Sequence, residues 1–353
     1  MTDHAAGAGG RTPTQDAPAP KAASGAASGS HVAAEDHAAS GGAEAGAPAK
    51  TTAPRTTPQD GLLEGRSDAG HDAVEAVAVE AVAAAARAAY GAVDSLAKAS
   101  DAVLDAALRV MARRLEERAA PVLEANAADQ DAARAAGISG GLLDRLRLDP
   151  GRLAAMATQL HALADVAPEP NRRPVRELPG GLVLEEWRRP VGAIGANFEA
   201  RPNVVVDIAS QFVKSRNGGV LRTGSAALGS AIALVDEVVA PALREAGLDP
   251  DAIQLVRTPG HESAQALVTQ PQLLPLVILR GSGGSTRQLA ERAAAHGVRT
   301  LAHADGGAVI YVDKAADPVC VSELIDASLD RLGVCNRLNL LLTHEAVWDV
   351  VVP

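Results

Sequence analysis

The sequence predicts an α/β fold built on a doubly wound parallel sheet, because strand-like and helix-like patterns alternate over much of the chain. From Pro190 onward, short runs rich in Val, Ile and Leu are each followed by a stretch with helical periodicity. Glycines close the helical stretches, as Gly247 and Gly297 do. The predicted strands cover 191–196, 220–222, 253–256 and 273–279. The predicted helices cover 204–213 (ending near Asn217-Gly218-Gly219), 226–246, 262–268 and 286–295.

The N-terminal part has a different character. Residues 1–70 consist mostly of Ala, Gly, Ser, Thr and Pro and contain no aromatic residue, so they cannot bury enough apolar surface to offset chain entropy. This region is predicted to be a disordered tail; a partner-binding or targeting arm is the alternative. Residues 71–167 show helical spacing, with helix starts at Ser100, Pro121 and Asp149. Gly180-Gly181 between two extended stretches predicts a β-hairpin.

Three regions therefore follow from the patterns. The tail covers 1–70, N-terminal helices with a nucleotide-binding α/β domain cover 71–300, and the start of a further α/β domain covers 301–353. The chain has 353 residues, which is enough for two domains with a sizeable core. The predicted core is built from Val, Leu, Ile and Ala, because aromatic residues make up only 2%.

Charge and cysteine content exclude several classes of protein. The net charge of −10 argues against nucleic acid as a partner. Two cysteines give no disulfide framework and indicate a reducing compartment. The sequence contains no uncharged run of about 18 apolar residues, so no membrane span is predicted. The N-terminus lacks the apolar core of a secretory signal. The nine histidines show no metal-ligand spacing, so no metal site is expected.

The most reactive side chain in a promising position is the thiol of Cys335. It lies in a short loop, Gly333 to Asn336, between a helical pattern over Val319–Leu332 and an apolar run, Leu338–Thr343, that predicts a buried strand. A thiolate there is a candidate nucleophile, and neighbouring backbone N–H groups are candidate donors to an oxyanion. The alternative is a small buried hydrophobic side chain, which is also the interpretation of Cys320.

Two loops that lead from predicted strands into helices have the composition of phosphate-binding turns. Each brings small residues and backbone N–H groups to a helix N-terminus beside an arginine. The strict dinucleotide fingerprint of spaced glycines is missing, and a tight turn is the alternative in each case. Pairing of the arginines with a ribose 2′-phosphate would favour NADP over NAD. The candidate cofactor residues are Arg222, Thr223, Gly224 and Ser225 in the first loop and Arg280, Gly281, Gly283, Gly284 and Ser285 in the second.

Three stretches together resemble the gamma-glutamyl phosphate reductase (glutamate-5-semialdehyde dehydrogenase) family, a branch of the aldehyde dehydrogenase superfamily. They are Leu123–Asp129 with its continuation to Leu146, then Arg189–Gly195 with Phe198–Val204, and Gly333–Asn336. The Glu-Ala-Arg-Pro-Asn segment from Glu199 to Asn203 is the most specific of them. The resemblance covers about 75–345 and implies an aldehyde-dehydrogenase-like fold in which the catalytic domain, from about 301, is incomplete at Pro353.

The resemblance implies a cytoplasmic enzyme of proline biosynthesis that reduces gamma-glutamyl phosphate to glutamate 5-semialdehyde with NADPH. In such an enzyme Cys335 would attack the acyl phosphate to give a thioester, with Asn336 as an oxyanion donor. Glu199, Arg201 and Asn203 would line the substrate side; an ion pair between Arg201 and Glu199 is the alternative for that arginine. The expected partner is a small-molecule substrate, with a homo-oligomer and a contact with glutamate 5-kinase as further expectations.

The chain also departs from the family pattern. Ala304, before Asp305-Gly306-Gly307, takes the place of the glutamate that activates water in oxidising aldehyde dehydrogenases, which suits an enzyme that delivers its thioester to hydride. Differences before and after the Cys335 loop leave two alternatives open. One is a reductase of another acyl phosphate or of an acyl-CoA. The other is a shortened, catalytically inactive relative.

Overall fold

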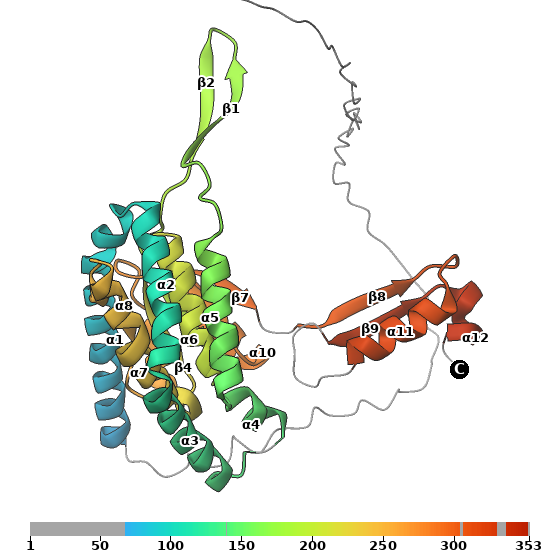
Figure 1. The fold of residues 1–353 in the computed structure, drawn as a ribbon, viewed down its shortest axis with the longest axis horizontal. Helices are drawn as coiled ribbons and strands as arrows, with labels where there is room; N and C mark the ends of the chain where they lie inside the picture. Colours follow the sequence, from blue (N-terminus) through green and yellow to red (C-terminus); the bar gives the residue numbers. More distant parts are fainter. Residues whose placement is uncertain (1–67, 139, 304–305, 330–336, 352–353) are drawn as a thin grey trace, which may run out of the picture. The chain divides into compact units, whose positions relative to one another are not determined.

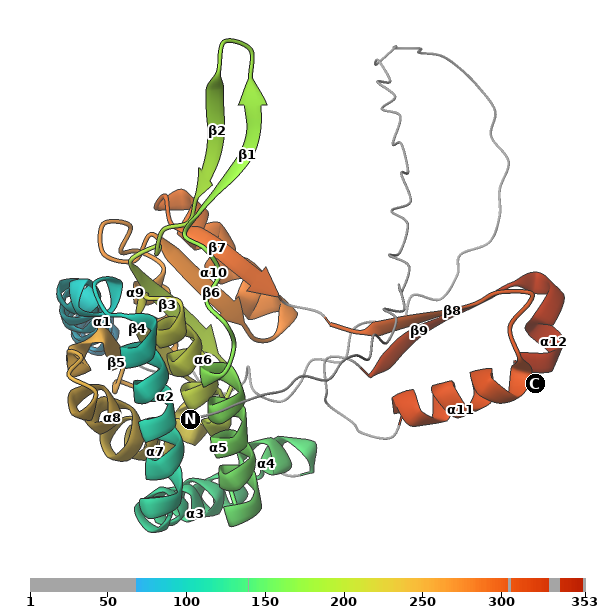
Figure 2. The same cartoon turned by 45° about the horizontal axis from the view of Figure 1, so that its top comes forward.

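The computed structural model describes residues 68–138, 140–303, 306–329 and 337–351 (Figure 1). Most of the predicted tail lies outside these residues. Five parallel strands form the central sheet in the order β5-β4-β3-β6-β7 (Figure 2). Their bounds are β3 (Ala193–Phe198), β4 (Gly218–Thr223), β5 (Ile253–Leu255), β6 (Leu276–Arg280) and β7 (Arg299–His303). The predicted doubly wound sheet is therefore confirmed, and the order in which the strands are added reverses between β3 and β6.

Helices cover both faces of the sheet because successive side chains of a strand point to opposite faces. In β3, Ala193 faces one apolar cluster, and Ile194, Ala196 and Phe198 face the other. The first cluster includes side chains of α1 (Asp68–Ala97), α9 (His261–Leu267) and α10 (Gly283–Ala295). The second includes α2 (Asp101–Glu117), α5 (Pro150–Ala164) and α6 (Pro202–Lys214).

Adjacent glycines show how closely the helices approach β4. A Cβ on Gly218 would lie 3.0 Å from the carbonyl oxygen of Ala89 in α1, and a Cβ on Gly219 would overlap the ring of Phe212 in α6. The sequence interpretation that placed this glycine pair at the end of a helix was wrong. The glycines are strand residues because helices on opposite faces leave no room for side chains.

The predicted helix starts at Ser100 and Asp149 are confirmed as N-caps, since their side chains accept bonds from the N–H groups of Val103 and Arg152. The helix predicted to start at Pro121 begins earlier, as α3 (Ala119–Ala135), and α4 (Gly141–Leu146) follows it. The strand predicted from Leu273 begins at Leu276. Pro275 directly before it has no N–H to donate to a ladder.

The long helix predicted over 226–246 forms with an irregularity. It comprises η1 (Ser225–Ala227), α7 (Leu228–Leu234), a π-helical segment η2 (Val235–Val239) and α8 (Ala240–Glu245); η3 (Pro250–Ala252) follows it. Pro241 has no N–H, so the carbonyl of Glu237 receives no bond from it. The Nε of Arg114 donates to that carbonyl instead, at 2.9 Å.

Two helical segments, Ala73–Ala97 and Ser225–Glu245, are long and apolar enough to cross a membrane by length and composition alone. Both supply fully buried side chains to the sheet domain, including Val82 and Leu96 from the first and Leu234 and Leu243 from the second. Helices that pack in a protein core have the same length and composition, and the buried side chains place both segments in the core of the sheet domain.

The hairpin predicted at Gly180-Gly181 is confirmed as β1 (Arg172–Leu178) paired antiparallel with β2 (Leu182–Trp187). Further along, β8 (Ala308–Val312) and β9 (Leu338–Thr343) pair in parallel, and α11 (Pro318–Leu329), η4 (Glu345–Val347) and α12 (Trp348–Val351) belong to the same region.

Two expectations about burial in this region were wrong. The strand β9 forms, but Leu340 is 48% exposed and Leu342 is 45% exposed. Cys320 was expected in the core and is exposed on α11. An apolar pattern shows which face of an element can be covered, whereas actual burial requires elements that pack on that face.

Candidate functional site

The carboxyl edge of the sheet brings the predicted loops to its topological switch point. β3 ends at Phe198, β4 at Thr223 and β6 at Arg280, and the order of the strands reverses between β3 and β6. In open parallel sheets, ligands bind in the crevice outside the carboxyl ends of strands at such a point. The loops after β3, β4 and β6 are those that the sequence selected for substrate and cofactor.

The loop after β4 packs directly on the loop after β3. The hydroxyl of Thr223 donates to the carbonyl oxygen of Glu199 at 3.2 Å. A Cβ on Gly224 would lie 3.1 Å from the backbone nitrogen of Ala200. The structure therefore brings Glu199, predicted to line the substrate side, beside Thr223 and Gly224, predicted to bind cofactor.

Arg201 forms the ion pair that the sequence left as an alternative. Its Nη2 lies 3.3 Å from Oε2 of Glu199, which also lies 3.4 Å from Nη1 of Arg145. Arg201 is the N-cap of α6, and its side chain keeps 34% of its surface exposed. The ion pair thus leaves part of the guanidinium accessible to an anionic group.

Asn203, the third predicted substrate residue, donates from Nδ2 to Oδ2 of Asp207 at 3.1 Å. Asp207 lies one turn further along α6, so the two side chains share a face of the helix. Burial raises the pKa of the Asp207 carboxyl, and the bond from Asn203 partly opposes that change.

Arg222 makes its contacts inside the protein. Its Nε donates to Oγ of Ser263 and its Nη1 to Oδ1 of Asn197, each at 3.2 Å, and its Nη2 donates to the carbonyl of Gly260. Burial lowers the pKa of the guanidinium, and the charge of Glu262 partly opposes that shift. These bonds tie β4 to β3, to α9 and to the loop before α9.

The turn after β6 offers backbone N–H donors at the start of a helix. Ser282 is the N-cap of α10, a helix of 13 residues that begins at Gly283. The N–H groups of Gly283, Gly284 and Ser285 fall in its first turn, where the helix itself supplies no acceptor. The exposed Arg280 ends the strand directly before this turn. The turn therefore suits a phosphate group.

A cleft of about 350 Å³ opens between α9 and α10, next to the same turn. Leu289 and Ala264 supply its apolar part, and the polar lining includes His261, Gln265, Ser285 and Arg292. Ser285 belongs both to the turn and to the cleft, so one ligand could place an anionic group on the turn and a ring in the cleft. This arrangement fits one nucleotide half of a nicotinamide dinucleotide.

Several predicted residues cannot be placed. Cys335 and Asn336, together with Ala304 and Asp305, lie outside the described residues. Their assigned roles stay predictions. Among the described residues no group of three or more His, Cys, Asp and Glu side chains is arranged to hold a metal ion.

Two polar side chains, on β3 and on α6, were not predicted as site residues from the sequence. Asn197 is 7% exposed near the end of the central strand, and Asp207 lines a cleft beside α6. Each interrupts an otherwise apolar run, Ala193–Phe198 in one case and Val204–Ile208 in the other. A polar side chain within a buried run was the available signal.

Comparison with known proteins finds relatives in one family. The aldehyde dehydrogenase family matches residues 222–353. The gamma-glutamyl phosphate reductase of Anaeromyxobacter sp. (strain K) is 39% identical over 256 residues, which cover 70% of this chain and 58% of that protein. That of Sorangium cellulosum is 40% identical over 267 residues, covering 73% and 61%. The chain thus spans about three fifths of the length of these curated relatives.

Solved structures agree with these matches. The crystal structure of gamma-glutamyl phosphate reductase from Thermotoga maritima aligns with a TM-score of 0.69 and 30% identity, covering 77% of this chain and 66% of that one. An acetylating aldehyde dehydrogenase from Geobacillus thermoglucosidasius, at 18% identity and a TM-score of 0.58, shares the fold. The chain therefore resembles the aldehyde dehydrogenase family and, within it, the gamma-glutamyl phosphate reductases.

Proposed function

We propose that the protein reduces gamma-glutamyl phosphate to glutamate 5-semialdehyde and phosphate, with NADPH, as a cytoplasmic enzyme of proline biosynthesis. The observation that carries the proposal is the 39% identity to gamma-glutamyl phosphate reductases over 256 residues. The contact between those loops at the switch point of the sheet supports it.

In the proposed reaction the thiolate of Cys335 attacks the acyl carbon of the substrate, and the C–O bond to phosphate breaks. The backbone N–H of Cys335 and the side chain of Asn336 donate to the oxyanion that forms during the attack. The exposed part of Arg201 pairs with an anionic group of the substrate, while Glu199 holds the guanidinium in place.

The resulting thioester is reduced at its carbonyl carbon, and the tetrahedral product expels the thiolate to give the aldehyde. A bound nicotinamide dinucleotide would supply the hydride for this step. The N–H groups of Gly283, Gly284 and Ser285 would hold its phosphates. The exposed Arg280 would pair with a 2′-phosphate and so favour NADP, since Arg222 is engaged inside the protein.

The reverse reaction gives the direct test. Purified protein is supplied with glutamate semialdehyde, inorganic phosphate and NADP⁺, and NADPH is followed by absorbance. Cys335→Ser is expected to reduce phosphate-dependent turnover to background, because a hydroxyl is a far weaker nucleophile than a thiolate. Cys320→Ser is the matched control, because it removes the exposed thiol of α11 and should leave turnover unchanged.

Retained turnover in Cys335→Ser would refute the nucleophile assignment. Replacing phosphate with coenzyme A separates the proposal from an acyl-CoA reductase, since only the latter would turn over with that acceptor. Protein that binds nucleotide but shows no turnover with any acyl acceptor would instead support an inactive relative.

A further inference from the structure

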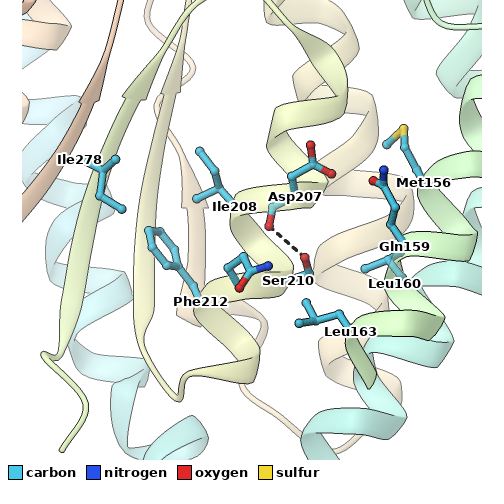
Figure 3. Close-up of a pocket in the computed structure, with 10 residues that line it drawn as sticks. Met156, Gln159, Leu160, Leu163, Asp207, Ile208, Ser210, Phe212 and Ile278 are labelled. Carbon is cyan, nitrogen blue, oxygen red and sulfur yellow. Dashed lines mark hydrogen bonds between the residues drawn. The ribbon is translucent and has the colours of Figure 1, made fainter. Parts of the chain in front are cut away.

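A second cleft, of about 420 Å³, lies beside α6, and Figure 3 shows the side chains that line it. α5 and α6 form its sides, and Ile278 of β6 contributes to its lining. Most of the lining is apolar, including Leu160, Ile208 and Phe212. Asp207 supplies its one carboxylate. The reaction described above makes no use of this cleft.

The negative charge of the Asp207 carboxylate has little compensation from neighbouring groups in the described part of the chain. Its Oδ2 accepts one bond, from Asn203 at 3.1 Å, and none of the ion pairs found in the described part of the chain includes Asp207. Burial raises its pKa. A partly buried carboxylate on an apolar face is costly without a cationic partner, so a residue of this kind in a cleft is a candidate binding group.

Lys214, on the same helix, shows the contrasting arrangement. Its ammonium group pairs with Asp105 at 2.5 Å and also donates to the carbonyl oxygen of Ala164. That partly buried charge is compensated within the fold, whereas the charge of Asp207 faces open space in the cleft.

The cleft continues the wall that carries the predicted substrate residues. α6 starts directly after the loop that holds Glu199 and Arg201, and Asn203 and Asp207 lie one turn apart on one face of it. A ligand held near Arg201 and Asn203 can therefore extend along α6 into the cleft.

The lining favours one kind of ligand. A divalent metal ion prefers several oxygen ligands, and the described residues hold no acidic cluster of that kind. One carboxylate beside aliphatic side chains instead suits an ammonium group on a short hydrocarbon chain, because the apolar lining covers the methylene groups and excludes water from the ion pair.

We propose that this cleft binds the amino-acid end of the acyl substrate and that Asp207 pairs with its α-ammonium group. The inference deepens the proposed function and rests on it for the identity of the ligand. Asp207 is then the residue that distinguishes an amino-acid substrate from an acyl compound of the same length without an amine.

Binding tests this inference separately from turnover. L-glutamate and glutarate have the same carbon chain and differ by the amine, so their dissociation constants are compared by isothermal titration calorimetry. The wild-type protein is expected to bind L-glutamate about 10- to 100-fold more tightly than glutarate, the range typical of one hydrogen-bonded charge pair. Asp207→Asn is expected to abolish that preference, and Asp94→Asn, which changes an exposed carboxylate of α1, to retain it.

Turnover gives the second measurement. With glutamate semialdehyde, Asp207→Asn is expected to raise KM by a similar factor at little changed kcat, while KM for 5-oxopentanoate, which lacks the amine, stays the same. A preference that survives in Asp207→Asn, or a wild-type protein without one, overturns the assignment of Asp207. If the protein turns over no substrate, yet still prefers the amine-bearing ligand in a way that depends on Asp207, the proposed function is refuted and the assignment of Asp207 stands.

A structural role for Asp207 would give a different result. The uncharged amide of Asn is cheaper to bury than the carboxylate, so Asp207→Asn should melt at the wild-type temperature or above it. If this variant does not fold, Asp207→Ser, which is smaller and also neutral, replaces it in both measurements. A melting temperature that falls together with an unchanged amine preference would identify Asp207 as a structural residue and overturn the proposal.

Discussion

The buried side chain of Asn126 joins three segments of the helical layer, and its removal should have a large, calculable cost. Its Nδ2 donates to the carbonyl oxygen of Leu146 at 2.8 Å and to Oγ of Ser230 at 3.0 Å. Its Oδ1 accepts from the N–H of Leu148 at 2.7 Å and from Nε2 of Gln130 at 2.8 Å. Asn126 is 0% exposed, so water cannot readily replace these bonds.

Asn126→Ala would leave two backbone groups without partners, the carbonyl of Leu146 and the N–H of Leu148, in residues that are 2% and 6% exposed. Each unsatisfied buried group costs about 1–3 kcal/mol, which gives a total of about 2–6 kcal/mol. Ser230 keeps its bonds to Asp129, so it adds no further penalty.

Urea unfolding followed by far-UV circular dichroism measures this cost, because the helices of the described part of the chain supply most of that signal. The midpoint should fall while the slope of the transition stays the same. Gln130→Ala is the matched control: it removes one bond from the same network at a partly exposed residue and should cost less than about 1 kcal/mol. A loss below about 0.5 kcal/mol for Asn126→Ala would refute the reasoning, since it would mean that water satisfies both backbone groups.

Three further predictions use the same preparations. Gly219→Ala should lower the melting temperature, because overpacking against Phe212 costs about 1–3 kcal/mol of unfolding free energy. Gly91→Ala, at an exposed helical position with open space around it, should raise the melting temperature slightly. Equal changes in the two variants would contradict the close packing at Gly219. The pKa of the Asp207 carboxyl is raised in the folded state, so the folded protein favours the protonated carboxyl. The stability that this preference adds is present at low pH and is lost as pH rises through the folded pKa. The melting temperature of Asp207→Asn relative to wild type should therefore increase from about pH 4 to pH 7, and a constant difference would contradict the shift. Arg280→Ala should raise KM for NADP⁺ by about tenfold and leave KM for NAD⁺ unchanged. An equal rise in KM for both cofactors would show that Arg280 does not pair with the 2′-phosphate.

The alternating pattern from Pro190 onward was sufficient to predict the sheet, because strands buried on both faces need continuous apolar runs. The errors occurred where packing decides the structure. Gly218 and Gly219 resemble a loop in sequence, yet they are strand residues because α1 and α6 approach β4 from opposite faces. The positions of those helices follow from the assembled sheet and leave no local signal.

The site was partly predictable for a similar reason. The turn from Arg280 to Ser285 carries its signal in consecutive residues, so the sequence placed it at the start of a helix, as the structure does. The cleft at Asp207 requires α5 and α6, which are separated along the chain by the β1–β2 hairpin and by β3. A single acidic residue in an apolar helix suggests a site only once the opposite wall is known.

Arg222 and Asp207 show how such charges can be interpreted. Both are partly buried, and burial favours the neutral form of each by lowering the pKa of Arg222 and raising the pKa of Asp207. Arg222 donates to Ser263, Asn197 and Gly260, so the fold itself satisfies its guanidinium. Asp207 accepts one bond and faces an open cleft, so folding leaves its charge without a cationic partner in the described part of the chain. The pKa shift alone does not separate a structural charge from a binding charge, whereas the partners of each charged group do, and they point to Asp207 as the group that a substrate completes.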